Sequence, residues 1–295
     1  MGREAGRAIR RTGLGLLALA CLAFAVPADS LPVVPSFSWN AGDPGGSPAA
    51  SWEAEGGGPT WNVSGASVVT GTSALPGITA AYAFDGVGDR IFGPSFQGLG
   101  AATGLRTSFE IWFRPTDLLG GAQVLLETGG RVDGLSITLD DASLLFRVQD
   151  DAVELASLYY DLTSVGAGEF IQVVGAVDLG GMAELFVNGA SVGTTSAAGI
   201  LDWAGGGSTG VGDVSGRVGG TNGPGEGDLF GYGSFAGEIA ILRYYEDELL
   251  DATEVAEHYV AIVANPEPET ALLLAMGLIG LTLGGRPRPT AAPRS

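Results

Sequence analysis

The sequence predicts an all-β protein in which two antiparallel sheets pack as a sandwich. Short segments alternate apolar and polar residues with a period of two, which is the pattern of half-buried strands. Glycine and aspartate residues separate these segments, and one Asn-Gly pair joins two of them. Many short strands connected by such turns favour two packed sheets over a helical architecture.

The strand pattern is clearest in the middle of the chain. Segment 108–115 alternates aromatic and aliphatic side chains with Glu110 and Arg114, so we expect one face in the core and the charged face in water. Segments 134–139 and 143–149 repeat this alternation, and the three residues between them suffice for a hairpin. Two further strands are expected at 170–179 and 235–243.

The strongest local signal is the pair Asn188-Gly189 between the strand-like segments 183–187 and 190–195. Asparagine and glycine both tolerate positive φ, which a type I′ turn requires at its two central positions. That turn matches the twist of the strands on either side. The sequence therefore predicts a tight two-residue hairpin here.

One helix is expected after the last strand, over residues 252–263. Asp251 and Glu254 have the spacing of a capping box, with Asp251 in place of the usual Ser or Thr. His258, the one histidine of the chain, falls on this helix beside Glu257. We expect it on the helix surface, in a structural or solvated role rather than a catalytic one.

The order of four motifs carries a resemblance to a known family. They are Tyr82-Ala83-Phe84-Asp85-Gly86, segment 108–115 with its tryptophan and final proline, Leu185-Phe186-Val187-Asn188-Gly189, and segment 235–239. This set resembles laminin-G-like domains of the concanavalin A-like jelly-roll class over residues 80–262. The resemblance implies an antiparallel jelly roll whose closing strand pairs with an N-terminal one, within 35–39 or 67–70.

Three tryptophans, Trp39, Trp52 and Trp61, lie among prolines and glycines before these motifs. Exposed indole rings would indicate stacking on sugars, whereas buried rings anchor a core, and we expect the core role. Residues 204–233 are rich in glycine without a strict nonapeptide period, so they are expected to form a long flexible loop rather than a calcium-binding β-roll.

Composition limits the partners of the protein. The chain carries 33 acidic and 14 basic residues, a formal net charge of −19. Such a field repels nucleic acid and anionic lipid, and it permits divalent cations and neutral polysaccharides. Solubility or a salt-adapted surface also accounts for the charge. With Cys21 as the single cysteine, no disulfide and no zinc site of histidines and cysteines is expected.

The N-terminal 28 residues have the form of a secretory signal peptide. Arginines precede an apolar stretch at 14–26, and Ala28 follows in a small-residue cleavage site. A twin-arginine export signal is less favoured, because Gly13 replaces the bulky apolar residue of that motif. A lipoprotein site at Cys21 is also less favoured, because the apolar stretch continues beyond it.

The C-terminal segment 264–295 joins a polar motif, Pro266-Glu267-Pro268, to an apolar helix at 270–285 and then to Arg286 and Arg288. The arginines are expected to hold the terminus on the cytoplasmic side of the inner membrane. This arrangement resembles the PEP-CTERM signal that exosortase recognises. A retained anchor helix is the main alternative, although the apolar run is short for a span of about 20 residues; a buried core helix fits the flanking residues poorly.

The resulting division is a signal peptide (1–28), a Gly/Pro-rich segment with the first strands (29–79), the jelly roll (80–263) and the sorting signal (264–295). Some laminin-G domains bind calcium, and Asp133 resembles their first ligand. Asp213 and Asn222 are candidates for the second. Calcium prefers six to eight oxygen ligands, so Asp133 alone leaves two interpretations open, a calcium site and a capped turn.

Catalysis has less support in the sequence. Glucan-cleaving enzymes of this fold carry alternating carboxylates on one strand; here Glu226 and Asp228 lie in the glycine-rich segment, and Phe230 stands where a further carboxylate is needed. The run 246–248 is acidic but consecutive, as in a solvated turn. The Gly-x-Ser-x-Gly spacing occurs at 189–193 and 206–210, but neither serine stands between an expected strand and an expected helix, which is the context of an activated serine.

We therefore expect an exported, non-catalytic module that binds carbohydrate or protein through loops at the sandwich edge. Exosortase would sort it to the outer surface or the exopolysaccharide matrix of a Gram-negative bacterium. Two alternatives remain open from the sequence: a glycan-cleaving hydrolase on the same fold, and a structural matrix protein without a discrete ligand.

Overall fold

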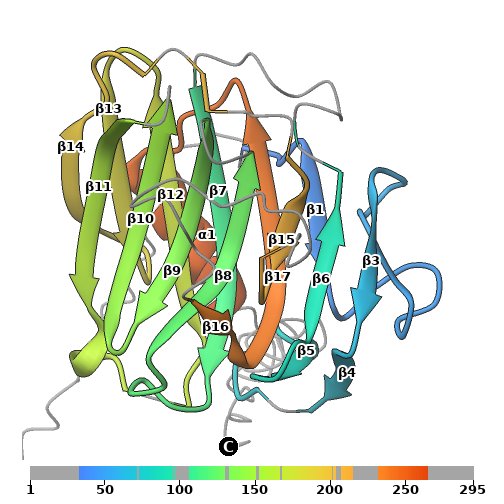
Figure 1. Ribbon diagram of the computed structural model, residues 1–295. Helices are drawn as coiled ribbons and strands as arrows, with labels where there is room; N and C mark the ends of the chain where they lie inside the picture. The colour runs from blue at the N-terminus through green and yellow to red at the C-terminus, as the bar shows by residue number, and fades with distance from the viewer. Residues whose placement is uncertain are drawn as a thin grey trace, which may run out of the picture. The chain divides into compact units, whose positions relative to one another are not determined.

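The computed structural model describes residues 33–264 except 72, 95, 97–105, 130–132, 151–152, 167, 201, 204–206 and 215–231. Within that part, the strands form two sheets that face each other, with all pairings antiparallel except one between β8 and β16. In Figure 1 one sheet faces the viewer, and the helix α1 is seen behind it. The predicted all-β sandwich is confirmed.

The sheet on the α1 side, called sheet A, has the strand order β14-β13-β12-β7-β17-β5-β4, with β1 also paired to β17. Its strands are β1 (Phe37–Asn40), β4 (Ser67–Thr70), β5 (Ala80–Asp85), β7 (Arg106–Pro115), β12 (Ile171–Asp178), β13 (Met182–Val187), β14 (Ala190–Ser196) and β17 (Ala236–Glu246). Both expected N-terminal strands therefore exist, and β1 is the one that pairs directly with the closing strand.

The opposite sheet, called sheet B, has the order β11-β10-β9-β8-β15-β6-β3-β2, with β16 also paired to β8. Its strands are β2 (Ser51–Glu53), β3 (Thr60–Ser64), β6 (Arg90–Gly93), β8 (Ala122–Gly129), β9 (Gly134–Asp140), β10 (Ser143–Asp150), β11 (Val153–Asp161), β15 (Thr209–Val211) and β16 (Gly233–Ser234). A single 3-10 turn, η2 (Leu162–Ser164), follows β11 in the described chain.

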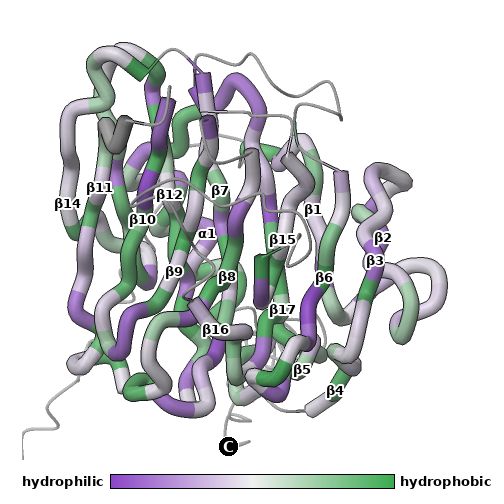
Figure 2. The backbone as a smooth tube through the Cα atoms, in the orientation of Figure 1, coloured by the Kyte–Doolittle hydropathy of each residue, from purple (hydrophilic) through white to green (hydrophobic). Residues whose placement is uncertain are grey.

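The main core lies between the two sheets. Successive side chains of a strand point to opposite faces of the sheet, and hydrophobic and hydrophilic residues are interspersed along the strands (Figure 2). Trp39, Trp52 and Trp61 are fully buried in this core, and Trp39 stacks on Trp61 with ring centroids 4.3 Å apart. The expectation that these tryptophans anchor a core instead of stacking on sugars is confirmed.

The predicted Asn-Gly hairpin is also confirmed. Asn188 and Gly189 have φ values of 49° and 80°, and they connect β13 directly to β14. A Cβ atom on Gly189 would lie 3.0 Å from the Cβ of Tyr259 in α1. The turn therefore needs glycine both for its backbone conformation and for its approach to the helix.

The helix α1 spans Ala252–Val263, as predicted, and begins with a complete capping box. The carboxylate of Asp251 accepts hydrogen bonds from the backbone of Thr253 and Glu254, while the Glu254 side chain accepts one from the Asp251 backbone. Its buried residues are Val255, His258 and Ile262, one face of the helix. This face covers the outer surface of sheet A.

Two expectations about strands are wrong. Segment 108–115 is not half-buried: Glu110 is fully buried, because α1 covers the face that the alternation assigned to water. The segment 204–233 is not simply a long loop, since Thr209–Val211 forms β15, fully buried between β8 and β6. Short strands rich in glycine lack the apolar alternation by which a sequence reveals them.

Candidate functional site

Two ion pairs lie on the outer face of sheet A, both between β7 and β17. The register of these strands places Glu110 opposite Arg243, and Arg114 opposite Glu238. Because Glu110 and Arg114 are four residues apart on one strand, they point to the same face. The two pairs therefore share one sheet surface, with the order of acid and base reversed between them.

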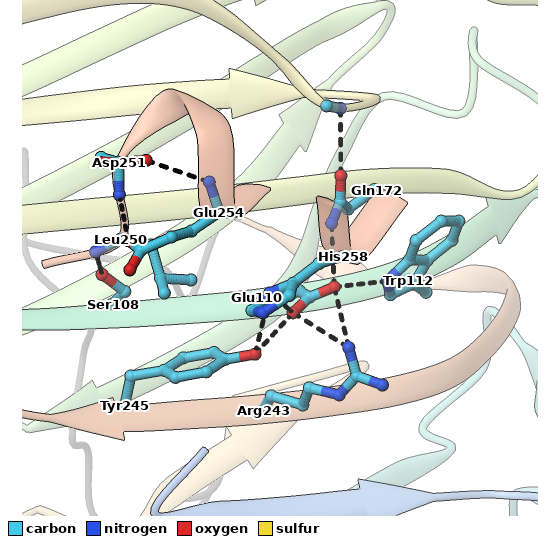
Figure 3. Close-up of polar contacts among 11 residues, drawn as sticks. Ser108, Glu110, Trp112, Gln172, Arg243, Tyr245, Leu250, Asp251, Glu254 and His258 are labelled. Carbon is cyan, nitrogen blue, oxygen red and sulfur yellow. Dashed lines mark hydrogen bonds and ion pairs between the residues drawn. The ribbon is translucent and has the colours of Figure 1, made fainter. Parts of the chain in front are cut away.

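The first pair is the centre of a buried cluster (Figure 3). Glu110 accepts hydrogen bonds from Trp112 Nε1 at 2.7 Å, Gln172 Nε2 at 2.9 Å and the Tyr245 hydroxyl at 2.9 Å. Arg243 approaches both carboxylate oxygens, at 3.2 and 3.3 Å. The Nδ1 atom of His258 completes the set, 3.3 Å from Glu110 Oε2. Glu110 is thus surrounded by donors on all sides.

This environment keeps Glu110 ionised. Burial alone would raise its pKa, but the guanidinium of Arg243 and the contacts with His258 and Gln172 outweigh burial and hold the pKa of Glu110 below its usual range. Burial and the neighbouring carboxylate raise the pKa of Tyr245, so its hydroxyl remains a donor. The Nδ1 atom of His258 is 3.2 Å from that hydroxyl.

The cluster joins three parts of the fold. Gln172 comes from β12, and its other amide atom accepts a hydrogen bond from Gly189 in the β13–β14 turn. His258 comes from α1, where it is 7% exposed. The expectation of a surface histidine is therefore wrong, because the helix face carrying His258 packs on the sheet. The cluster fixes α1 and the hairpin to β7.

The second pair is open to solvent. The Nη2 atom of Arg114 donates to Glu238 Oε1 at 2.6 Å, and the two side chains are 20% and 18% exposed. The guanidinium also lies over the ring of Phe170, 4.9 Å from its centroid. Arg114 is therefore held in position by a carboxylate and an aromatic ring while part of it stays accessible.

Two hollows meet at Arg114, and we call them together the Arg114 groove. One, of about 370 Å³, is lined by Glu238, Thr116 and the backbone of Gly237. The other, of about 350 Å³, is lined by Phe170, Asn188 and Tyr259. Both include Arg114 and Gly168, so they are neighbouring parts of one surface depression.

Phe170 and Tyr259 form the aromatic wall of this groove, and contacts beneath it hold Tyr259 in place. The ring of Tyr259 stacks on Trp112 with centroids 5.8 Å apart and an interplanar angle of 7°. Trp112 is fully buried and donates to Glu110, so the buried cluster supports the wall from beneath. An ionic group and two aromatic side chains thus converge on one concave site, which is typical of a ligand-binding surface.

Of the residues predicted for calcium, Asp133 and Asp213 lie among the described residues. Asp133 lies at the bend before β9, and Asp213 is buried, with its carboxylate accepting hydrogen bonds from Val214 and Ser234. No three His, Cys, Asp or Glu side chains come together in the part of the chain that the structure describes. Calcium binding at Asp133 stays a prediction.

The other predicted sites fall outside the described residues. These are Ala28, Pro266, Glu267, Pro268, Arg286 and Arg288, together with Asn222, Glu226 and Asp228. No helix among the residues with a described structure is long and apolar enough to cross a membrane. The acidic run 246–248 ends β17 in an exposed turn, where Asp247 has a φ of 58°, as a solvated turn predicts.

Sequence reasoning identified neither the Glu110 cluster nor the Arg114 groove as a site. The available signal was the charge on a strand that also carries Trp112, since Glu110 and Arg114 alternate with an otherwise apolar face. Their partners Arg243 and Glu238 lie more than a hundred residues later. Only the strand register brings each pair together.

Fold and site together define an antiparallel β-sandwich with a concave polar and aromatic groove. The chain belongs to the concanavalin A-like lectin/glucanases superfamily, whose laminin-G-type sequence pattern matches residues 95–256. This agrees with the resemblance drawn from the ordered motifs. None of the curated proteins matches the chain in sequence.

Solved structures with this fold include receptor-binding domains of toxins. The botulinum neurotoxin type G domain has a TM-score of 0.54 at 14% identity, over 77% of this chain and 51% of that one. The binding domain of Paraclostridial Mosquitocidal Protein 1 gives 0.54 at 13% identity, over 76% and 51%. The present chain spans about half the length of these structures, and at such identities the likeness shows the fold alone.

Proposed function

We propose that this protein is a non-catalytic carbohydrate-binding module and that the Arg114 groove is its binding site. The observation that carries the proposal is the partly exposed Arg114–Glu238 pair beside the aromatic wall of the groove. The superfamily, which includes lectins, supports it. The toxin domains of similar fold are receptor-binding domains, which is consistent with a binding role.

The chemistry of the groove suits a neutral sugar. Sugar hydroxyls both donate and accept, and the groove offers guanidinium donors beside carboxylate acceptors. Hydrogen bonds to charged groups are roughly twice as strong as neutral ones. Phe170 and Tyr259 supply apolar surface for the C–H face of a sugar ring. The acidic net charge of −19 favours neutral over anionic glycans.

A glycan array probed with the full chain, with and without calcium, tests this function. We expect binding to a restricted set of neutral glycans. The Arg114→Gln variant should weaken it about tenfold or more, as expected for a lost charge-assisted hydrogen bond. Arg90→Gln is the matched control, because Arg90 also lies over a phenylalanine ring but on sheet B. No binding in either condition would favour a structural matrix protein instead.

We also propose export and sorting to the cell envelope or matrix. The support is the sequence alone: the signal peptide ending near Ala28 and the tail with Pro266, Glu267 and Arg286. Exosortase would be the processing partner, acting while the apolar helix lies in the inner membrane. Deleting residues 266–295 should release the domain into the medium. Unchanged localisation of the truncated protein would contradict the sorting role.

A glycan-cleaving hydrolase is the second candidate. One specific observation favours it: Glu238 and Glu169 line the two hollows that share Arg114. Glycosidases place two carboxylates about 5–10 Å apart on either side of the scissile bond. Release of reducing sugar from a β-glucan by the wild-type chain, abolished by Glu238→Gln and by Glu169→Gln, would establish hydrolysis and overturn the non-catalytic proposal.

A further inference from the structure

A second cavity lies directly against the Glu110 cluster. It has a volume of about 550 Å³, within the range of small-molecule sites. Its lining includes Arg243, Tyr245 and His258, which all contact Glu110, and the segment Val33, Val34 and Pro35. None of these residues lines the Arg114 groove. This cavity is therefore a separate site.

The rim of the cavity is apolar and open. Val34 is 80% exposed, although it sits beside Pro35 and near Ala261 of α1. Covering such surface contributes about 25 cal/mol for each Å² removed from water. A ligand with an apolar body would therefore gain free energy at the rim.

The inner polar groups require a ligand that both donates and accepts. Both neighbours of His258 Nδ1, the Tyr245 hydroxyl and Glu110, have oxygen acceptors, so in the neutral ring the hydrogen belongs on Nδ1 and the other ring nitrogen is an acceptor. Arg243, which is 20% exposed, supplies donors. A ligand hydroxyl can donate to the ring nitrogen of His258 and accept from Arg243.

The charges around the cavity favour a neutral ligand over an anionic one. The negative charge of Glu110 is balanced by Arg243, and Glu55 adds a further carboxylate to the lining. The remaining charge is negative, in a chain whose net charge is −19. A carboxylate ligand would be repelled, whereas a neutral hydroxyl would not.

We propose that this cavity binds a small neutral amphiphile, with its hydroxyl at His258 and Arg243 and its apolar body against Val34, Pro35 and Ala261. The protein then has a second ligand site, independent of the carbohydrate site at Arg114. Both sites contact α1, the carbohydrate site at Tyr259 and the cavity at His258 and Ala261.

The probe for the test is 1-naphthol, titrated into the full chain and followed by its fluorescence. We expect saturable binding, with 1-methoxynaphthalene at least about fivefold weaker, because it lacks the donor hydrogen. Ala261→Trp fills the cavity and should weaken 1-naphthol at least tenfold. Val34→Asp should weaken it severalfold by placing a charge on the rim.

Two matched variants control for binding elsewhere. Val260→Trp changes the neighbouring helix residue, 57% exposed, and Val87→Asp changes an 82% exposed valine outside the cavity lining. Both should leave the affinity within about twofold, as surface changes away from a site do. All four variants retain the apolar segment 270–283, so binding of 1-naphthol to that segment contributes equally in all four. Absence of binding, or equal affinity in all four, would overturn the proposal.

Discussion

The two ion pairs of β7 and β17 differ in what surrounds them, and the difference separates a structural role from a binding role. In the first pair Glu110 is fully buried under α1, with every lone pair of its carboxylate near a donor, while Arg243 is 20% exposed. Arg114–Glu238 lies beyond the helix, where both side chains are partly exposed. The carboxylate of the first pair therefore acts within the fold, whereas both members of the second pair stay accessible to a ligand.

The largest expected effect is the loss of the buried charge. Glu110→Gln removes the counter-charge of Arg243 and turns an amide NH₂ toward donors, so we expect about 3–5 kcal/mol of destabilisation. Urea unfolding followed by tryptophan fluorescence measures it. A loss below about 1 kcal/mol, the level of a surface pair, would remove the distinction between the two pairs.

A single hydrogen bond to the same carboxylate should matter less. Tyr245→Phe deletes the 2.9 Å bond to Glu110 and should cost about 2 kcal/mol, as bonds to charged groups do. Tyr82→Phe is the matched control, because its hydroxyl makes only a 3.4 Å contact with the carbonyl of Ser51. Equal losses in the two variants would show that the Glu110 cluster has no special strength.

Acid should weaken the first pair selectively. Below about pH 4.3, the ordinary pKa of glutamate, the unfolded chain takes up a proton at Glu110. The folded chain does not, since its pKa is lowered. Stability contributed by Glu110 is therefore present above that pH and lost as the pH falls, by up to about 1.4 kcal/mol per pH unit.

Urea midpoints at pH 5, 4 and 3 for the wild type and Glu110→Gln isolate this contribution. Other carboxylates titrate in both proteins, so the difference in slope reports Glu110 alone. We expect a flatter dependence in the variant. Parallel curves would mean that the pKa of Glu110 is not lowered in the folded protein.

Local patterns predicted three features: the alternation of residues predicted the sandwich, the Asn188-Gly189 pair predicted the hairpin, and the capping box predicted the helix α1. The same alternation assigned Glu110 to water, since a period of two says which residues share a face but not what covers it. The cover comes from α1, some 140 residues later. Both proposed ligand sites have lining residues on that helix, so neither was visible in the local pattern.

The smallest effect on stability is expected at the exposed pair. Glu238→Gln should change the free energy of unfolding by less than about 1 kcal/mol, because partly exposed ion pairs contribute little. Its melting temperature should therefore remain close to that of the wild type. A loss as large as that of Glu110→Gln would assign the Arg114–Glu238 pair to the fold and weaken its role as a binding group.

The most direct test of the binding role is isothermal titration of one glycan from the array into the wild type, Arg114→Gln and Arg90→Gln. We predict that Arg114→Gln binds about tenfold more weakly while its unfolding midpoint is unchanged, and that Arg90→Gln binds like the wild type. Equal affinity of all three proteins would contradict a carbohydrate site in the Arg114 groove.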